Sequence, residues 1–489
     1  MTSDLKPYPA YKDSGVEWLG KVPTHWEILP NRTLFEEVKE RDRPEEPMLS
    51  VTIKQGVIRQ KDLLEDNSKK DGSNLDRSAY KLVRPGDIAY NKMRAWQGSV
   101  GASEYQGIVS PAYVVERPRK GVSSHYFHYL LRQPSFAKEA ERWSYGITSD
   151  MWSLRPEHFK MIYACLPPLP EQTAIVHFLD HADRRIRRYI RAKQKLIALL
   201  EEQKQAIIHH AVTGQIDGRT GEPYPDYKDS GVKWLGDVPK HWEVRPFTRI
   251  AIEKADYRGA TPAKKESGVF LVTAKNIRKG WIDYEASREF VAEEEYPNIM
   301  RRGFPRQGDM LLTTEAPLGH AALVDSEDIA LAQRVIRFRL SSGILLSEFA
   351  LHSVLDWYFQ NQLMCRGTGS TALGIKASKL PQLKILCPPL NEQHAILGQI
   401  AKVQGRIDLE RKAVARQVEL LNEYRTRLIA DVVTGKLDVR EAAAELPEVD
   451  PLAEDDLDGT IHDGENSNLG ELDAEESAEE YTIAKEMPL

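Results

Sequence analysis

Basic, amide, hydroxyl and aromatic side chains stand beside glycines in four stretches of the chain, two in each half. The stretches are residues 90–98 and 142–148 in the first half and residues 275–280 and 366–371 in the second. Arg and Lys can bind guanine edges, Asn and Gln can bind adenine edges, and hydroxyl groups suit phosphate oxygens. These residue types therefore indicate DNA contacts, although polar, glycine-rich turns also occur in ordinary surface loops. The candidate DNA-binding residues are Asn91, Lys92, Arg94, Gln97, Arg142, Ser144, Tyr145, Thr148, Lys275, Asn276, Arg278, Thr314, Arg366, Thr368, Ser370, Thr371 and Lys376.

Sequence motifs of the common catalytic sites are absent. The chain contains no GxxxxGK(S/T) phosphate loop, no GxSxG nucleophile elbow and no HExxH zinc helix. The Pro-Pro pairs at 167–168 and 388–389 are each followed by Leu, and neither has the preceding Asp or Asn of an amino-methyltransferase motif. Cys165, Cys365 and Cys387 lack metal-ligand spacing. We expect a chain with no catalytic residues and no metal or cofactor of its own.

The net charge of −6 conceals a division between a basic body and an acidic end. Residues 441–489 hold 17 Asp or Glu and one Lys, while residues 1–440 hold 66 basic and 56 acidic side chains. We expect residues 441–489 to be disordered, because a segment that is highly charged and poor in aromatic residues cannot bury enough surface to fold alone. It either keeps the protein in solution or competes with nucleic acid for the basic body. No apolar run approaches the roughly 20 residues of a membrane span, so we expect a cytoplasmic protein.

An aromatic segment occurs twice in the sequence. Residues 8–27 read YPAYKDSGVEWLGKVPTHWE and residues 224–243 read YPDYKDSGVKWLGDVPKHWE, with 16 of 20 positions identical. A repeat this close predicts that the chain is a tandem duplication. Trp18, His25 and Trp26 recur in the second copy. We expect them to anchor the segment by packing, with a partner-binding surface as the alternative.

Each half ends in a long predicted helix. Residues 167–218 open with PPLPEQ, and residues 387–440 carry PPLNEQ at an offset of 221. Apolar residues recur at spacings of 3 and 4 from Ile175 to Ile207, which is typical of a coiled-coil seam, with Lys193 as a polar interruption. Such a helix would rise by about 65 Å and needs a partner, for which its repeat is the candidate. The cations of residues 184–195 either track phosphates or form ion pairs, and His209 and His210 are expected at the surface.

Two variable blocks lie between these elements. Both contain short β-prone runs, the turn Arg84-Pro85-Gly86-Asp87 matches Arg306-Gln307-Gly308-Asp309, and one helix is predicted in each block, over 124–143 and 347–365. We predict an α+β fold: two globular α+β domains separated by two long antiparallel coiled-coil helices, with an internal pseudo-twofold repeat and a disordered acidic C-terminal tail. The predicted boundaries are 1–27 for the first aromatic segment, 28–166 for the first variable domain, 167–218 for the central spacer helix, 219–243 for the repeated aromatic segment, 244–386 for the second variable domain, 387–440 for the C-terminal spacer helix and 441–489 for the tail.

With its paired YKDSGVxWLGxVPxHWE segments and PPLxEQ helix openings, the chain resembles the specificity subunit of Type I restriction-modification enzymes over residues 8 to about 440. The resemblance implies that blocks 28–166 and 244–386 are target-recognition domains, each of which reads one half of a bipartite site in double-stranded DNA. It implies two modification (methyltransferase) subunits and ATP-dependent restriction subunits as partners. S-adenosylmethionine, ATP and Mg would belong to those partners, and this chain would be non-catalytic.

Three alternatives to this function remain open. The chain could be a specificity subunit or fragment of another methyltransferase system, Type II-like, or a DNA-binding scaffold without sequence preference. A catalytic fusion would be recognised by cofactor binding or DNA modification by the purified chain alone. A scaffold would bind all sequences equally at moderate salt, where nonspecific phosphate binding weakens.

Overall fold

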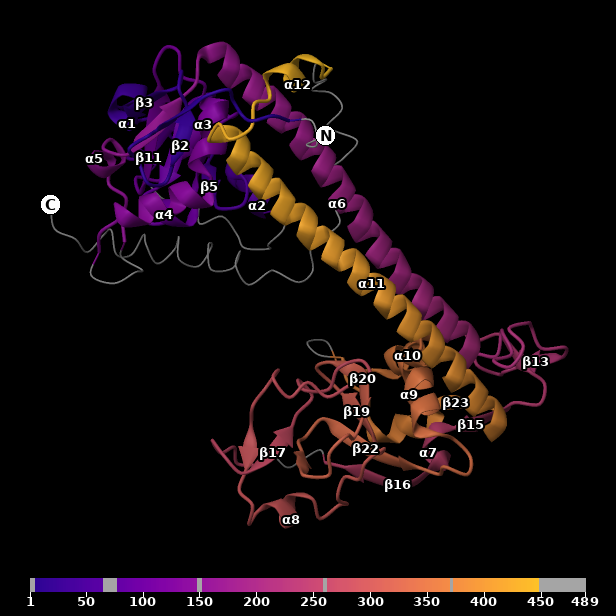
Figure 1. Cartoon of the computed structure of the whole chain (residues 1–489). Helices are drawn as coiled ribbons and strands as arrows, with labels where there is room; N and C mark the ends of the chain where they lie inside the picture. The colour runs from indigo at the N-terminus through magenta and orange to yellow at the C-terminus, as the bar shows by residue number, and fades with distance from the viewer. Residues whose placement is uncertain (1–4, 65–76, 147–151, 258–261, 370–372, 448–489) are drawn as a thin grey trace. The chain divides into compact units, whose positions relative to one another are not determined.

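The computed structural model describes residues 5–64, 77–146, 152–257, 262–369 and 373–447. The chain divides into two compact units: unit 1 is Met1–Arg188 with Asn422–Leu489, and unit 2 is Tyr189–Leu421. The two longest helices, α6 (Leu169–Val212) and α11 (Leu390–Val433), each contribute residues to both units (Figure 1). No helix among the described residues is long and apolar enough to cross a membrane.

Unit 1 is built on a four-stranded antiparallel sheet in the order β4 (Phe35–Val38), β11 (Tyr113–Pro118), β8 (Ile88–Asn91) and β9 (Val100–Ala102). The strand that follows the aromatic segment, β3 (Glu27–Pro30), pairs with β12 (Tyr163–Leu166), which directly precedes α6. The variable block therefore begins and ends at one strand pair. The other elements of unit 1 are β1 (Tyr11–Asp13), β2 (Lys21–Pro23), α1 (Asn31–Leu34), β5 (Leu49–Thr52), β6 (Gly56–Arg59), α2 (Gln60–Leu64), β7 (Lys81–Val83), η1 (Ala95–Gln97), β10 (Gly107–Val109), α3 (Ser124–Leu131), α4 (Pro134–Arg142), α5 (Pro156–Phe159) and α12 (Arg440–Ala444).

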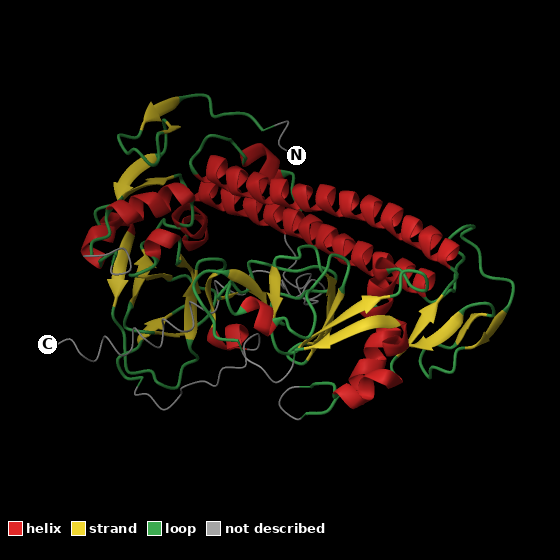
Figure 2. Ribbon diagram, turned by 90° about the horizontal axis from the view of Figure 1, so that it is seen from below, coloured by secondary structure: helices red, strands yellow, loops and turns green. Residues whose placement is uncertain are grey.

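Unit 2 has the same sheet order, with β16 (Ala251–Asp256), β22 (Val335–Leu340), β19 (Met310–Thr314) and β20 (Leu318–Leu323). Its β15 (Glu243–Pro246) pairs with β23 (Lys384–Cys387), as β3 pairs with β12. Figure 2 shows these strands as arrows. The other elements of unit 2 are β13 (Tyr227–Asp229), β14 (Asp237–Pro239), α7 (Phe247–Ile250), β17 (Val269–Val272), β18 (Phe290–Val291), α8 (Tyr296–Ile299), β21 (Ile329–Leu331), α9 (Ser347–Leu355), α10 (Trp357–Arg366) and η3 (Ala377–Gln382).

The repeated Gly-Asp turn has the same structural task in both sheets. Asp87 accepts two hydrogen bonds from Arg117 on the neighbouring strand, at 2.9 and 3.0 Å. Asp309 accepts the equivalent pair from Arg339, at 2.9 and 2.8 Å, and a third bond of 2.7 Å from the fully buried Arg337. The turn thus ties two strands of each sheet together through a charged pair.

The two helices predicted over 124–143 and 347–365 are each broken in two, so this prediction was wrong. Gln133 has an extended backbone before Pro134, because a proline disfavours the helical conformation of the residue that precedes it. The second break lies at Asp356, also extended, whose side chain accepts a hydrogen bond from the Tyr358 backbone N–H and caps α10. A capping residue between two helical segments ends one helix and begins the next.

The long helices pair in opposite directions within each unit, and both views show them side by side (Figures 1 and 2). In unit 1, Asp183 of α6 pairs with Arg425 of α11. In unit 2, Glu201 pairs with Arg411 at 2.6 Å and Lys204 with Asp408 at 3.1 Å, so numbers rise along α6 as they fall along α11. The predicted bounds of 167–218 and 387–440 shorten to 44 residues in each helix.

The apolar seam predicted from Ile175 to Ile207 is only partly buried. Ile175 and Leu179 are buried, whereas Leu196 is 42% exposed. Polar pairs replace apolar contacts in the middle of α6, where Lys193 donates a 2.5 Å hydrogen bond to Gln417. Of the cations in 184–195, Arg187 forms an ion pair of 2.7 Å with Asp183 of its own helix.

The aromatic segments anchor the first turns of the long helices. Glu171 accepts hydrogen bonds from the Tyr8 hydroxyl and from Trp26 Nε1 at 2.9 Å, and it contacts His25 Nε2 at 2.8 Å. Glu392 receives the equivalent bonds from Tyr224, Trp242 and His241. Glu171 and Glu392 come from the two PPLxEQ motifs. In each unit, therefore, the repeated aromatic segment binds the repeated PPLxEQ motif.

The end of α11 closes unit 1 in the way that the end of α6 closes unit 2. Gly435 lies against Pro23 and Trp26, as Gly214 lies against Pro239 and Trp242. The backbone N–H of Asp438 then donates a 2.8 Å bond to Lys6. The predicted disordered tail of 441–489 is incorrect at its start, because α12 (Arg440–Ala444) is helical and Ala443 is buried. Residues 448–489 lie outside the described residues.

His209 is held by polar neighbours, against the expectation of a surface residue. Its Nδ1 lies 2.9 Å from Asp356 Oδ2, and its Nε2 accepts a 3.3 Å hydrogen bond from Trp357 Nε1. Asp356 therefore caps α10 and fastens it to the end of α6 inside unit 2. The next residue on α6, His210, stacks at a tilt on the His209 ring with centroids 5.8 Å apart.

Candidate nucleic-acid interface

The candidate residues of unit 1 gather at the hairpin between β8 and β9. Asn91 Oδ1 accepts a 2.9 Å bond from the Met93 backbone N–H, which begins the turn, and Gly98 ends it at φ 95°. Within this turn Gln97 is exposed, and Lys92 and Arg94 are half-buried. The hairpin thus presents basic and amide groups at one edge of the sheet.

A loop from after α4 packs on this hairpin. Tyr145 pairs with Ser153 in an isolated bridge that closes the loop. The next residue, Leu154, donates a 2.9 Å backbone bond to Lys92, and Trp152 lies edge-on to Trp96 with ring centroids 5.6 Å apart. Stretches 90–98 and 142–146, which are distant in sequence, therefore meet at one place. Thr148 lies outside the described residues.

Unit 2 has the same arrangement at the hairpin between β19 and β20. Thr368 pairs with Gly374 in an isolated bridge, and Ile375 donates a 2.9 Å backbone bond to Thr314. Gly374 also bridges to Glu315 in the hairpin turn. Thr368 and Lys376 are exposed on this closing loop, and Arg366 at the end of α10 is half-buried. Ser370 and Thr371 lie outside the described residues.

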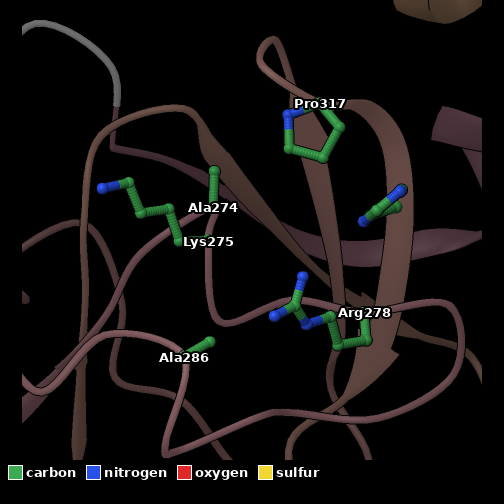
Figure 3. A pocket seen from close by; sticks show the side chains of 6 residues that line it. Ala274, Lys275, Arg278, Ala286 and Pro317 are labelled. Atoms are coloured by element: carbon green, nitrogen blue, oxygen red, sulfur yellow. The ribbon is translucent and has the colours of Figure 1, made fainter. Parts of the chain in front are cut away.

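The second basic stretch of unit 2 reaches the same hairpin from its other strand. The Gly280 backbone N–H donates a 2.8 Å bond to Ala321, and His320 Nδ1 lies 2.9 Å from the Ile277 carbonyl oxygen. Lys275, Arg278, His320, Ala274, Ala286 and Pro317 line a half-open pocket of about 290 Å³ (Figure 3). We refer to these six residues as the His320 pocket. It joins cationic, imidazole and apolar groups in one recess.

Four of the candidate residues have structural tasks. Asn276 is fully buried and bonds the Asp283 and Ser287 carbonyls, and Thr314 is 1% exposed and donates to the Arg334 carbonyl. Buried Ser144 donates to Ala140, and Asn91 holds the turn described above. Their side chains stabilise loops and offer little to DNA, because small polar residues beside glycines are also what turns require.

The remaining candidates differ in how freely they can reach a ligand. Arg142 lies 3.7 Å from both Glu139 and Glu17, so its charge is partly offset. Tyr145 is 60% exposed at the closing loop of unit 1. In unit 2 Lys275 and Arg278 are exposed, and Arg278 Nε bonds Asp283 at 3.1 Å.

Two further residues lie next to these candidates and had no sequence signal. Lys81 is buried beneath the hairpin of unit 1, where its Nζ donates a 2.5 Å bond to the Tyr113 carbonyl. Burial, together with the nearby charge of Lys92, lowers the pKa of Lys81 to about 8. The second is His320 on β20, which is distant in sequence from the 275–280 stretch that it contacts. Among the described residues, no group of three or more His, Cys, Asp or Glu could hold a metal ion.

Comparison with known proteins finds one family domain within the chain and similar sequences over most of its length. Residues 239–420 match the Type I restriction modification DNA specificity domain. The chain is 24% identical over 373 residues to the Type I restriction enzyme MjaVIII specificity subunit of Methanocaldococcus jannaschii, covering 73% of this chain and 81% of that protein. It is 22% identical over 447 residues to the Type I restriction enzyme EcoKI specificity subunit of Escherichia coli, covering 86% and 90%.

A solved structure shows the same fold. Its chain, reported under "complex assembly and conformational transition of the type I R-M system", has a TM-score of 0.61 and 16% sequence identity. The match covers 85% of this chain and 99% of that one. The family match and the similar specificity subunits confirm the resemblance predicted from the repeated motifs: the chain is similar to the DNA specificity subunits of Type I restriction-modification enzymes.

Proposed function

We propose that this chain is the DNA sequence-specificity subunit of a Type I restriction-modification complex, in which each unit reads one half of a bipartite site. The observation that carries the proposal is the convergence in each unit of two distant polar stretches on one hairpin of the same sheet. Exposed basic and amide groups on a rigid hairpin suit base edges and phosphates in a DNA groove. The similar specificity subunits support this reading.

We assign the spacing of the two half-sites to α6 and α11. Each helix has 44 residues and rises by about 66 Å, which exceeds the roughly 34 Å of one turn of DNA. In the proposal these antiparallel helices separate two target-recognition domains, within 28–166 and 244–386, and also offer a docking surface to two modification subunits. In the proposal, the two units act as equivalent readers, one for each half-site.

The chemistry belongs to the partners in this proposal. The modification subunits would bind S-adenosylmethionine, and the restriction subunits would use ATP and Mg in the same cytoplasmic complex. This chain would act without catalysis of its own: it would select the DNA on which the partners act.

Mapping of methylated adenines tests the proposal. In a host that carries this chain with its modification partner, methylation should mark one bipartite motif with two specified half-sites and a fixed spacer. Methylation without a sequence preference would contradict the function. Exchange of residues 28–166 for another recognition domain should alter one half-site only, and a change in both half-sites would contradict separate readers.

Shortening the helices tests the spacing role. The contacts of Lys193 with Gln417 and of Glu201 with Arg411 show that residues 194–200 of α6 lie opposite residues 411–417 of α11, so one heptad can be removed from both helices together. Each heptad supplies about 10 Å of rise, so the spacer should shorten by at most about three base pairs while the half-sites stay the same. A spacer of unchanged length would contradict this role for the helices.

A further inference from the structure

The His320 pocket joins three kinds of group that a DNA base edge requires. Arg278 supplies a planar guanidinium, His320 a ring nitrogen, and Ala274, Ala286 and Pro317 supply apolar walls. In Figure 3 the Arg278 guanidinium points into the space among the labelled side chains, while the Lys275 side chain extends away from that space. A bare phosphate would need the cations but not the apolar walls.

The tautomer of neutral His320 is set by the protein. A carbonyl oxygen can only accept, so the Nδ1 atom carries the proton of the 2.9 Å contact with Ile277. The Nε2 atom is then left as a hydrogen-bond acceptor on the half-buried ring. The bond also fixes the ring against the 275–280 stretch, so the acceptor is held in place before any ligand binds.

Arg278 is oriented in a similar way. Its Nε donates to Asp283 at 3.1 Å, which leaves the terminal nitrogens of the guanidinium for the pocket. Asp283 is in turn bonded through its carbonyl to the buried Asn276, so the loop that carries Arg278 is itself held. A guanidinium in a fixed orientation suits the paired acceptors of guanine.

We propose that the His320 pocket is the base-reading subsite of unit 2, in which Arg278 binds a guanine edge and His320 Nε2 accepts from the amino group of adenine or cytosine. Lys275 at the rim contacts the phosphate backbone and adds affinity without sequence preference. This assignment rests on the proposed DNA-reading function, and it names His320 as a specificity-determining residue. An acceptor at this position favours bases that present an amino group in the major groove.

The test uses the full chain in complex with its modification subunits and a pool of duplexes with randomised sequence, selected by binding and read by sequencing. His320→Asn keeps a donor where Nδ1 bonds Ile277 but removes the acceptor at Nε2. It should relax the preference at one position of one half-site by about tenfold and leave the other half-site unchanged. His320→Gln, which carries its amide at the reach of Nε2, should restore part of that preference.

Two further variants separate the roles within the pocket. Arg278→Lys loses the bidentate geometry and should relax a guanine position in the same half-site. Lys275→Ala should weaken binding to all sequences equally and lower the salt dependence. A thermal melt of each variant shows whether the fold is kept.

The outcomes distinguish this inference from the proposed function. A wild-type complex that selects no motif overturns the function itself. A wild-type motif that His320→Asn and Arg278→Lys both leave unchanged overturns only the assignment of the pocket. Equal relaxation of both half-sites by His320→Asn would also overturn it, because the pocket belongs to one unit.

Discussion

Glu116 makes unit 1 sensitive to pH in a way that can be measured. It lies on β11 between β4 and β8, it is fully buried, and within the described residues neither carboxyl oxygen has a hydrogen-bond partner. Burial raises the pKa of Glu116 to about 7, although Lys160 nearby acts in the opposite direction. The pKa of Glu37, which lies beside Glu116 on β4, shifts the other way. Burial raises this pKa, but hydrogen bonds from Lys160 and Lys39 lower it further, so the pKa of Glu37 is below its usual value. In unit 2 the position that matches Glu116 is Phe338.

The stability of unit 1 should therefore fall as the pH rises. The unfolded chain releases the Glu116 proton near pH 4.3, whereas the folded chain keeps it until about pH 7. The stabilisation by the protonated form is full below about pH 4.3 and is lost as the pH passes through 7. Between pH 5 and pH 8 the loss is on the order of 2 to 3 kcal/mol. Glu116→Leu removes the titrating group. The free energy of unfolding of this variant, relative to that of wild type, should therefore increase by the same amount between pH 5 and pH 8.

Urea unfolding of the full chain at pH 5, 6, 7 and 8 measures the difference between wild type and Glu116→Leu. Phe338→Leu is the matched control, because it changes the same position of the other sheet without a titrating group, and its effect should not depend on pH. If the free energies of unfolding of Glu116→Leu and wild type differ by the same amount at pH 5 and at pH 8, the buried carboxyl does not titrate in this range.

Two charged contacts give further predictions of stability. Asp309→Asn should destabilise unit 2 by about 3 to 5 kcal/mol, because it weakens the pairing of the fully buried Arg337. The matched change Asp87→Asn should have a smaller effect in the same urea titration, since its partner Arg117 is 39% exposed, and equal losses would contradict this reasoning. Glu171→Ala leaves the buried donors of Tyr8 and Trp26 without an acceptor and should destabilise unit 1 by about 1 to 3 kcal/mol for each donor. Glu171→Gln keeps one acceptor and should cost less in thermal unfolding, and a Glu171→Ala protein as stable as wild type would refute the anchoring role.

The sequence alone determined the frame of this protein. The aromatic segments, the PPLxEQ openings and the Gly-Asp turns could be recognised because each depends on a local pattern or on identity between two copies. The long helices could be predicted from their period, although the predicted ends lay two to seven residues outside the observed ones. Local patterns of this kind do not change with the rest of the fold.

The tertiary structure decided which polar residues share a surface. Asn276 and Thr314 are polar candidates like Lys275 and Lys376, yet the first two are buried and the last two are exposed. His320 had no local signal, because its task depends on a contact with Ile277, 43 residues away.

The closing of unit 1 by the end of α11 depends on the same kind of distant contact, as the bond between Asp438 and Lys6 shows. Local sequence fixes which elements form, because propensity and period act over a few residues. Burial and hydrogen bonding between distant segments then decide which side chains are left to meet a ligand, and those contacts exist only in the folded chain.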